Sequence, residues 1–200
     1  MSPTPARTSR DAIIAAARSL LEEEGLDAVT MASVADRVGV RPPSLYKHVR
    51  DRGALIAAVS DAAALELGLV LEAAVRSVPD EGTDDGAHAR ILRAALAFRA
   101  LASRSPRSVS LVFAGLGGDL QPSVETAAIA ARPLLEISAE LAGQDRALVT
   151  ARALTAFAYG FCAMEQGQAF RFGGDVDEAF SAGIEALIRG LAQPGSVRSE

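Results

Sequence analysis

Residues 30–55 read TMASVADRVGVRPPSLYKHVRDRGAL, and this stretch decides the fold that we predict for the whole chain. Its pattern fits two short helices joined by a tight turn, the arrangement of a helix-turn-helix. Thr30 is a suitable N-cap, and Val34 and Val38 lie four residues apart, so they share one face of a short helix. Gly39 follows that helix, and glycine tolerates the left-handed conformation that a turn needs there. We therefore expect a tight turn at Gly39.

The second helix is predicted to begin at Pro42 or Pro43, since proline is tolerated in a first helical turn. Its outer face carries polar side chains, among them Lys47, the only lysine of the chain. Such a helix can enter the major groove of DNA, whereas the alternative is an ordinary solvated face. The pattern favours DNA contact, with Arg41 and Ser44 at base edges and Lys47 at bases or phosphates. The predicted DNA-binding residues are Thr30, Ser33, Arg41, Ser44, Tyr46, Lys47, His48 and Arg52.

The same residues resemble the DNA-binding domain of TetR-type transcriptional regulators. That domain usually carries the string Ser-Leu-Tyr-x-His-Phe, followed shortly by a lysine and an Ala-Leu pair. Here residues 44–48 read SLYKH, with Val49 in place of the phenylalanine and Arg52 in place of the lysine. Gly53 departs from the family's usual glutamate. The resemblance implies a homodimer that binds a double-stranded DNA operator and answers to a small-molecule effector.

Composition supports a helical protein. The chain has 200 residues, of which 50% are hydrophobic and only 4% aromatic, a mix that favours helices over sheets. We predict an all-α fold, in which an N-terminal three-helix bundle with the helix-turn-helix precedes a larger helical domain, and the resemblance implies that this larger domain serves ligand binding and dimerisation. The predicted parts are a DNA-binding domain at 1–50, a connecting helix at 51–77, a ligand-binding and dimerisation domain at 78–193 and a disordered tail at 194–200.

Charge is distributed unevenly along the chain. Residues 1–60 hold 8 Lys and Arg against 7 Asp and Glu, and residues 61–200 hold 12 against 18. Only the N-terminal part is therefore suited to face phosphates. Cys162 is the single cysteine, so no internal disulfide is possible and a reducing compartment is expected. The longest weakly charged stretch, residues 153–164, is too short to span a bilayer, and we expect a cytoplasmic protein without a membrane partner.

Helix boundaries follow from apolar periodicity and from glycine and proline. Thr8 and Asp11 form a capping pattern ahead of a first helix that ends at Gly25. The connecting helix is expected to run from Asp51 toward Ser77, so that a tilt at one of its ends moves the other. Pro133 should kink one of the later helices. Those later helices are predicted at 84–104, 106–115, 121–142, 145–171 and 175–192.

The C-terminal region resembles one branch of the same family, whose ligand domain is named for a Trp-His-Gly signature. The match lies in residues 98–102, FRALA, and in scattered positions from Tyr159 to Phe170. Tyr159 replaces the histidine, and the chain has no tryptophan. This resemblance implies that the helices near 145–171 and 175–192 pair with their copies in a second subunit, and that the remaining helices enclose a cavity.

Apolar residues at helical spacing are candidates for that cavity, although each taken singly is more often plain core. Glu165 is added because it is polar in apolar surroundings and could orient a ligand; capping or interface hydrogen bonds explain it equally well. The predicted ligand-binding residues are Phe98, Leu101, Leu111, Phe113, Leu116, Phe157, Phe161, Met164 and Glu165.

Catalysis has little support in the sequence. The two histidines, His48 and His88, lie in different regions, and no metal-ligand cluster is found in the sequence. No Ser-His-Asp pattern or phosphate-binding glycine loop is present. We expect no catalytic residue, metal or cofactor. A repressor released by an apolar or amphipathic ligand is the favoured function, while an activator of the same fold, or a ligand-binding protein without operator binding, stays open.

Overall fold

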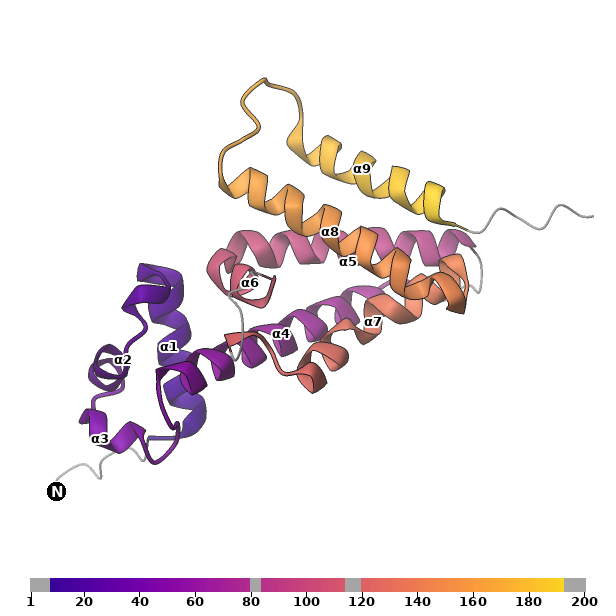
Figure 1. The fold of residues 1–200 in the computed structure, drawn as a ribbon. Helices are drawn as coiled ribbons and strands as arrows, with labels where there is room; N and C mark the ends of the chain where they lie inside the picture. Colours follow the sequence, from indigo (N-terminus) through magenta and orange to yellow (C-terminus); the bar gives the residue numbers. More distant parts are fainter. Residues whose placement is uncertain (1–7, 80–83, 114–119, 193–200) are drawn as a thin grey trace, which may run out of the picture. The chain divides into compact units, whose positions relative to one another are not determined.

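The computed structural model describes residues 8–79, 84–113 and 120–192, and every regular element within them is helical (Figure 1). The all-α prediction is thus confirmed. Leu116 and the predicted tail lie outside the described residues. Two short 3-10 turns, η1 (Leu26–Ala28) and η3 (Gln144–Arg146), accompany the α-helices. The α-helices are α1 (Arg10–Glu24), α2 (Met31–Arg37), α3 (Pro42–Leu45), α4 (Arg52–Arg76), α5 (Asp84–Arg104), α6 (Pro106–Phe113), α7 (Val124–Ala142), α8 (Ala147–Gln166) and α9 (Val176–Leu191).

The chain divides into two compact units. Unit 1 comprises Met1–Leu65 and Ser105–Ala127, and unit 2 comprises Glu66–Arg104 and Ala128–Glu200. Helix α4 begins in unit 1 and ends in unit 2, and α6 belongs to unit 1, which the sequence did not indicate. The predicted ends of the DNA-binding domain at residue 50 and of the connecting helix at residue 77 concern function and not compactness, and they stay predictions.

Unit 1 is built around one apolar core to which α1, α2, α3, the start of α4 and α6 contribute. Ser9 caps α1, because its hydroxyl accepts a hydrogen bond from the Ala12 amide at 3.1 Å, so the cap lies one residue after the predicted Thr8. The Glu22 carboxylate accepts from the Ser108 amide at 2.6 Å and thereby fixes the first turn of α6 to α1. Buried members of this core include Ile13, Ala17, Leu20, Leu21, Val34, Ala35, Leu45, Val49, Leu55, Ile56 and Leu111.

Unit 2 is a bundle in which α5, α8 and α9 pack pairwise against one another. Two glycines allow close packing. A Cβ on Gly183 of α9 would lie 2.2 Å from the Phe157 ring, and one on Gly68 of α4 would lie 2.8 Å from the Ala130 Cα of α7. Glycine is therefore required at these two crossings because no larger residue fits without displacement.

Two helices are shorter than the sequence predicts. Helix α8 ends at Gln166 and not at residue 171, because Gly167, Gln168 and the residue after it turn back to donate amide hydrogen bonds to α8 carbonyls. Helix α3 is only four residues long, and Tyr46 is its C-cap. The amides of His48 and Val49 both bond to the Leu45 carbonyl, so residues 46–48 form a turn and not a helical face.

Two stretches are long and apolar enough, by length and composition alone, to cross a membrane, and both are longer than the weakly charged stretch at residues 153–164. They are Arg52–Arg76 and Gln144–Gln166. In the first stretch, 56% of the most apolar 18 residues are buried inside the protein. In the second stretch, the corresponding share is 33%. The second helix therefore keeps an apolar surface uncovered.

Asp51 anchors the start of α4. Its Oδ1 accepts from the Ala54 amide at 2.8 Å, and its Oδ2 accepts from Arg50 Nε at 2.7 Å. The hydrogen bond from the Ala54 amide, followed by that from Arg50, lowers the pKa of the Asp51 carboxyl below its usual value. The carboxylate is thus stabilised in the folded state.

Lowering the pH should weaken this anchor. Because the folded pKa of Asp51 is lowered, its contribution to stability is present above the ordinary value of 3.8 and is lost as the pH falls through the folded pKa. Asp51→Ala should lower the melting temperature at pH 7. Asp51→Asn, which still caps a helix, should lower it less and reduce its dependence on pH below 4. Thermal unfolding followed by circular dichroism measures both effects, and equal melting temperatures for the two variants would contradict the capping role.

The Gly183 crossing gives a second prediction. Gly183→Ala should lower the free energy of unfolding by about 1–3 kcal/mol, because the new methyl group displaces the Phe157 ring. Ala131→Ser, at an exposed site on α7, is the control because no packed side chain has to move there. It should change the stability by no more than about 0.5 kcal/mol. Urea unfolding measures both, and equal losses would count against the crossing.

Candidate nucleic-acid interface and ligand pocket

Helix α2 is fixed at its start by a reciprocal capping box. Thr30 Oγ1 accepts from the Ser33 amide at 3.1 Å, and Ser33 Oγ accepts from the Thr30 amide at 3.0 Å. The Ser33 hydroxyl also donates to the Ala28 carbonyl at 2.6 Å. Both residues were predicted to bind DNA, and in this structure their hydroxyls first of all position α2.

The turn between α2 and α3 has the expected geometry. Gly39 has φ +72°, the left-handed conformation that glycine adopts without strain, so the predicted turn is confirmed. The Val40 amide donates to the Ala35 carbonyl at 2.9 Å and closes the turn. Leu45 and Val49 are buried in the core of unit 1. These contacts set the direction of α3 and of the turn that follows it.

Residues 41–48 form the exposed part of this motif, which we call the recognition segment. Arg41, Lys47 and His48 are exposed, Tyr46 is 55% exposed, and Ser44 is half-buried. The side chains of Arg41, Lys47 and His48 form no ion pair or hydrogen bond within the part of the chain that the structure describes. The structure thus brings these five predicted residues together on one short segment.

Arg52, the eighth predicted DNA-binding residue, has a structural partner. Its Nε donates to the Val29 carbonyl at 2.6 Å and its Nη2 to the Leu26 carbonyl at 2.7 Å. The side chain thereby ties the start of α4 to η1. Nearby Arg37 pairs with Glu23 through two 2.8 Å hydrogen bonds, which raise the pKa of the guanidinium and lower that of the carboxyl. Arg41 and Lys47 of the recognition segment differ from these two arginines because no described residue pairs with their side chains.

The predicted ligand-binding residues divide between the two units. Leu111 and Phe113 lie on α6 in unit 1, where Leu111 belongs to the core. The others that the structure describes lie in unit 2: Phe98 and Leu101 are buried on α5, whereas Met164 on α8 is 51% exposed. Which of them touch a ligand stays a prediction.

Four phenylalanines form an aromatic cluster in unit 2. Phe161 lies 5.8 Å from Phe157, 5.1 Å from Phe180 and 4.7 Å from Phe170, measured between ring centroids. Two members were predicted to line a cavity, but these rings pack against one another. Such pairs add to the stability of a core beyond their buried area.

Arg99 joins three helices beside this cluster, a role that no pattern in the sequence indicates. From α5 it donates Nε to Glu165 Oε2 on α8 at 3.0 Å and Nη2 to Glu165 Oε1 at 2.5 Å. Its Nη2 also lies 2.7 Å from Asp177 Oδ1 on α9. The hydrogen bond with Glu165 is the main cause that raises the pKa of Arg99, and the guanidinium lies 5.1 Å from the Phe180 ring centroid. The pairing with Arg99 explains why the polar Glu165 lies among apolar residues of the sequence.

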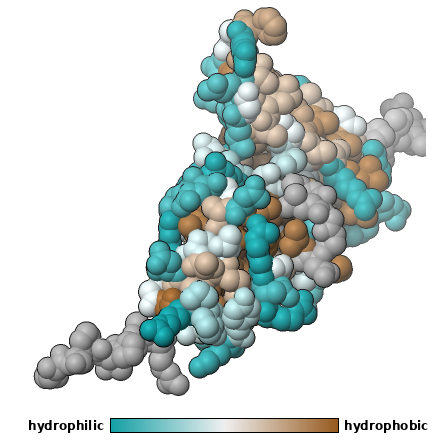
Figure 2. Space-filling model, turned by 60° about the vertical axis from the view of Figure 1, so that its left-hand side comes forward, coloured by the Kyte–Doolittle hydropathy of each residue, from teal (hydrophilic) through white to brown (hydrophobic). Residues whose placement is uncertain are grey.

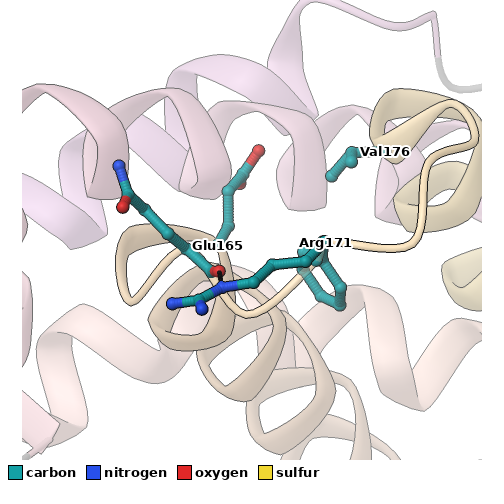
Figure 3. A pocket seen from close by; sticks show the side chains of 5 residues that line it. Glu165, Arg171 and Val176 are labelled. Atoms are coloured by element: carbon teal, nitrogen blue, oxygen red, sulfur yellow. Dashed lines mark hydrogen bonds between the residues drawn. The ribbon is translucent and has the colours of Figure 1, made fainter.

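A surface hollow of about 370 Å³ lies where α8 ends and α9 begins. In Figure 3 the Arg171 side chain extends across the hollow, with Glu165 on one side and Val176, from the first turn of α9, on another. Glu165 is the predicted ligand-binding residue that lines it. No group of three or more His, Cys, Asp or Glu able to hold a metal ion occurs among the described residues. The lining residues are Glu165, Gln168, Phe170, Arg171 and Val176.

Two family models match the chain. The model described as bacterial regulatory proteins, tetR family, matches residues 13–59, and that described as tetracyclin repressor-like, C-terminal domain, matches residues 91–187. The first spans most of α1, η1, α2, α3 and the start of α4. The second covers most of unit 2, and the narrower Trp-His-Gly branch stays a prediction.

Known proteins agree with these models. The class A tetracycline repressor of Escherichia coli is 31% identical over 92% of this chain and 81% of its own length. The class D repressor of Escherichia coli is 40% identical, but the match spans only 27% of its length. A Rhodococcus sp. RHA1 protein of unknown function superposes with a TM-score of 0.77 at 26% identity, covering 96% of this chain and all of the other.

A further solved structure is a TetR variant from Acinetobacter baumannii AYE in complex with minocycline. It has a TM-score of 0.64 at 27% identity and covers 92% of this chain and 96% of that one. The helix-turn-helix with its exposed recognition segment, the all-helical second unit and these matches lead to one conclusion. The chain belongs to the TetR family of bacterial transcriptional regulators.

Proposed function

We propose that this chain is a cytoplasmic homodimeric repressor that binds a two-fold symmetric DNA operator and is released by a small apolar or amphipathic effector. The observation that carries the proposal is the recognition segment. Its basic side chains are exposed and have no ion-pair partner among the residues that the structure describes, while Leu45 and Val49 hold it to the core. A fixed backbone with free positive charges is what phosphate and base contacts require. Family membership supports the same function.

Contacts within the recognition segment are proposed by position. Arg41 is the N-cap of α3, so it stands at the end of the helix that would enter the major groove first. Arginine and serine at such positions hydrogen-bond to base edges. Tyr46, Lys47 and His48 follow in the turn and would reach the phosphates on either side. Arg52 would act mainly by bracing this segment, with a phosphate contact left to its remaining N–H groups.

The dimer is proposed to form through α8 and α9. On α8, Leu148 and Val149 are 50% and 57% exposed, and the small Ala156 and Ala163 continue the same face. Figure 2 shows apolar and weakly polar residues, brown to white, gathered over part of the surface that these helices form. On α9 the exposed residues Ala179, Ala182 and Ala186 recur at helical spacing. Small side chains let helices approach closely, and the family acts as dimers, so we infer that a second copy covers this face.

Release of the operator would follow from a shift in populations. An effector that binds the DNA-incompetent dimer better moves the equilibrium by no more than its preference between the two states. A hundredfold preference corresponds to about 2.7 kcal/mol. The solved relative bound to minocycline supports an effector of drug-like size. An activator would use the same sites, and a reporter gene assayed with and without this protein separates the two signs of regulation.

Removing Lys47 tests the DNA contacts. Lys47→Ala should weaken binding to operator and random duplexes alike and reduce the slope of log K against log salt by about one. Arg41→Ala should cost about 1–3 kcal/mol on the operator only. Fluorescence anisotropy with DNA from upstream of the gene measures both effects, with Arg132→Ala on α7 as the matched control. Unchanged binding in both variants would refute the proposed contacts, and no operator binding by the unaltered protein would favour a ligand-binding protein without a DNA role.

A charge on the α9 face tests the dimer. Ala182→Arg should dissociate the homodimer, because two buried copies of a cation would face each other across a symmetric interface. Operator affinity should fall with it. Ala131→Arg, at an exposed site on α7, is the control and should remain dimeric. Sedimentation equilibrium distinguishes the two, and a dimeric Ala182→Arg protein would place the subunit interface elsewhere.

A further inference from the structure

We propose that the hollow at the junction of α8 and α9 binds a small monocarboxylate, whose carboxylate pairs with Arg171 and whose apolar body lies on Phe170 and Val176. This inference rests on the proposed function, since it names the chemical class of a regulatory ligand. It concerns the surface hollow at the end of α8, where Phe170 is 38% exposed, and not the packing among the other rings of the aromatic cluster. The site is formed entirely by unit 2.

Arg171 supplies the cation. Its Nε donates to the Gln168 carbonyl at 2.9 Å, which holds the side chain along the loop and across the hollow (Figure 3). Its two terminal nitrogens form no hydrogen bond or ion pair with any residue that the structure describes. A guanidinium with this edge free matches the two oxygens of a carboxylate in a planar, bidentate pair. Arg171 is therefore preset for an anion.

The acidic groups beside the hollow already have a partner. Both oxygens of Glu165 accept hydrogen bonds from Arg99, and Asp177 pairs with the same guanidinium. The Asp175 carboxylate accepts from the amides of Asp177 and Glu178 and caps α9. These contacts direct the carboxylates toward Arg99 and toward the helix end. Arg171 stays as the cation available to a ligand.

The backbone conformation of Gln168 is a further indication of a ligand site. It is the one non-glycine residue with a positive φ, +53°, among the described residues, and it lines the hollow. A glycine would take this place after a helix without strain, whereas glutamine adopts it with backbone strain. Its amide N–H2 group is a donor suited to a second contact with a carboxylate. Strain at a residue that lines a site is the pattern of a functional constraint.

Size and lining define the ligand further. The hollow of about 370 Å³ lies within the range of small-molecule sites, roughly 300–1,000 Å³. Phe170 offers an aromatic ring and Val176 a branched aliphatic group, so a short aromatic or aliphatic acid fits both. The corresponding amide would keep the apolar contact but lose the charge pair. Because α8 and α9 also carry the proposed subunit face, a ligand here would bear directly on the dimer.

The test uses the full chain and three probes, phenylacetate, 4-methylpentanoate and octanoate, with phenylacetamide as the uncharged comparison. Isothermal titration calorimetry and saturation-transfer NMR measure binding. We expect at least one acid to bind with a Kd below about 10 mM and the amide to bind at least tenfold more weakly, a difference of about 1.4 kcal/mol. Failure of all three acids to bind, or equal binding of acid and amide, would overturn the proposal.

Two variants locate the site. Arg171→Gln should weaken binding of the acid about tenfold, whereas Arg132→Gln on α7 should leave it unchanged. Gln168→Gly should raise the melting temperature, because it relieves the left-handed strain, and yet weaken acid binding. Acid affinity unaffected by Arg171→Gln refutes the site. If Gln168→Gly raises the melting temperature without weakening acid binding, Gln168 is not part of the carboxylate site. The site then stands or falls with the effect of Arg171→Gln.

Operator binding measured on the same samples separates this inference from the proposed function. A protein that binds its operator but none of the acids refutes only the carboxylate site. One that binds an acid at Arg171 but no operator refutes the repressor and leaves the site standing. Arg171→Gln should bind operator as the unaltered protein does in the absence of acid, which also shows that this variant is folded.

Discussion

Burial of Leu45 and Val49 is the constraint on which the DNA-facing part of the molecule depends. Helix α3 has four residues, far fewer than a helix needs to persist by itself in water. Its geometry therefore comes from packing, with each large apolar side chain contributing about 1.5–3 kcal/mol when buried. Val34 and Ala35 of α2 receive these side chains in the same core. Because Leu45 and Val49 are buried in this core, the neighbouring Arg41, Lys47 and His48 face the solvent.

Unit 2 is held in register by a different kind of interaction. Apolar packing of α5, α8 and α9 would tolerate several relative rotations of the helices, but the contacts of Arg99 are compatible with only a few of these rotations. It must meet Glu165 and Asp177 at once while lying over the Phe180 ring. With the arginine side chain only 15% exposed, the loss of charge hydration offsets much of the pairing energy. Its main effect is thus to select one arrangement of α9, which also shapes the hollow beside it.

Much of the helix plan could be predicted because glycine and proline mark most of its ends. The start of α6 at Pro106 and the turn at Gly39 needed only local chemistry. The end of α8 could not be predicted, since a glutamine at positive φ makes that turn and the apolar residues continue past it. Arg52 and Arg99 were missed as structural residues for another reason. Their partners lie more than twenty positions away, and no local pattern reports such contacts.

Continuity of α4 bounds how a ligand in one unit can influence the other. The helix passes from unit 1 to unit 2 between Leu65 and Glu66, and its unit 2 part crosses α7 with Gly68 against the Ala130 backbone. A crossing without side chains between the backbones has little room to yield, so a shift of α7 must move α4 or open the contact. Any coupling is reciprocal: DNA that favours one position of α4 must lower the affinity for a ligand that favours the other, by the same factor. The strength of induction is thus set by the ligand's preference between the two positions of α4, and not by how tightly it binds either one.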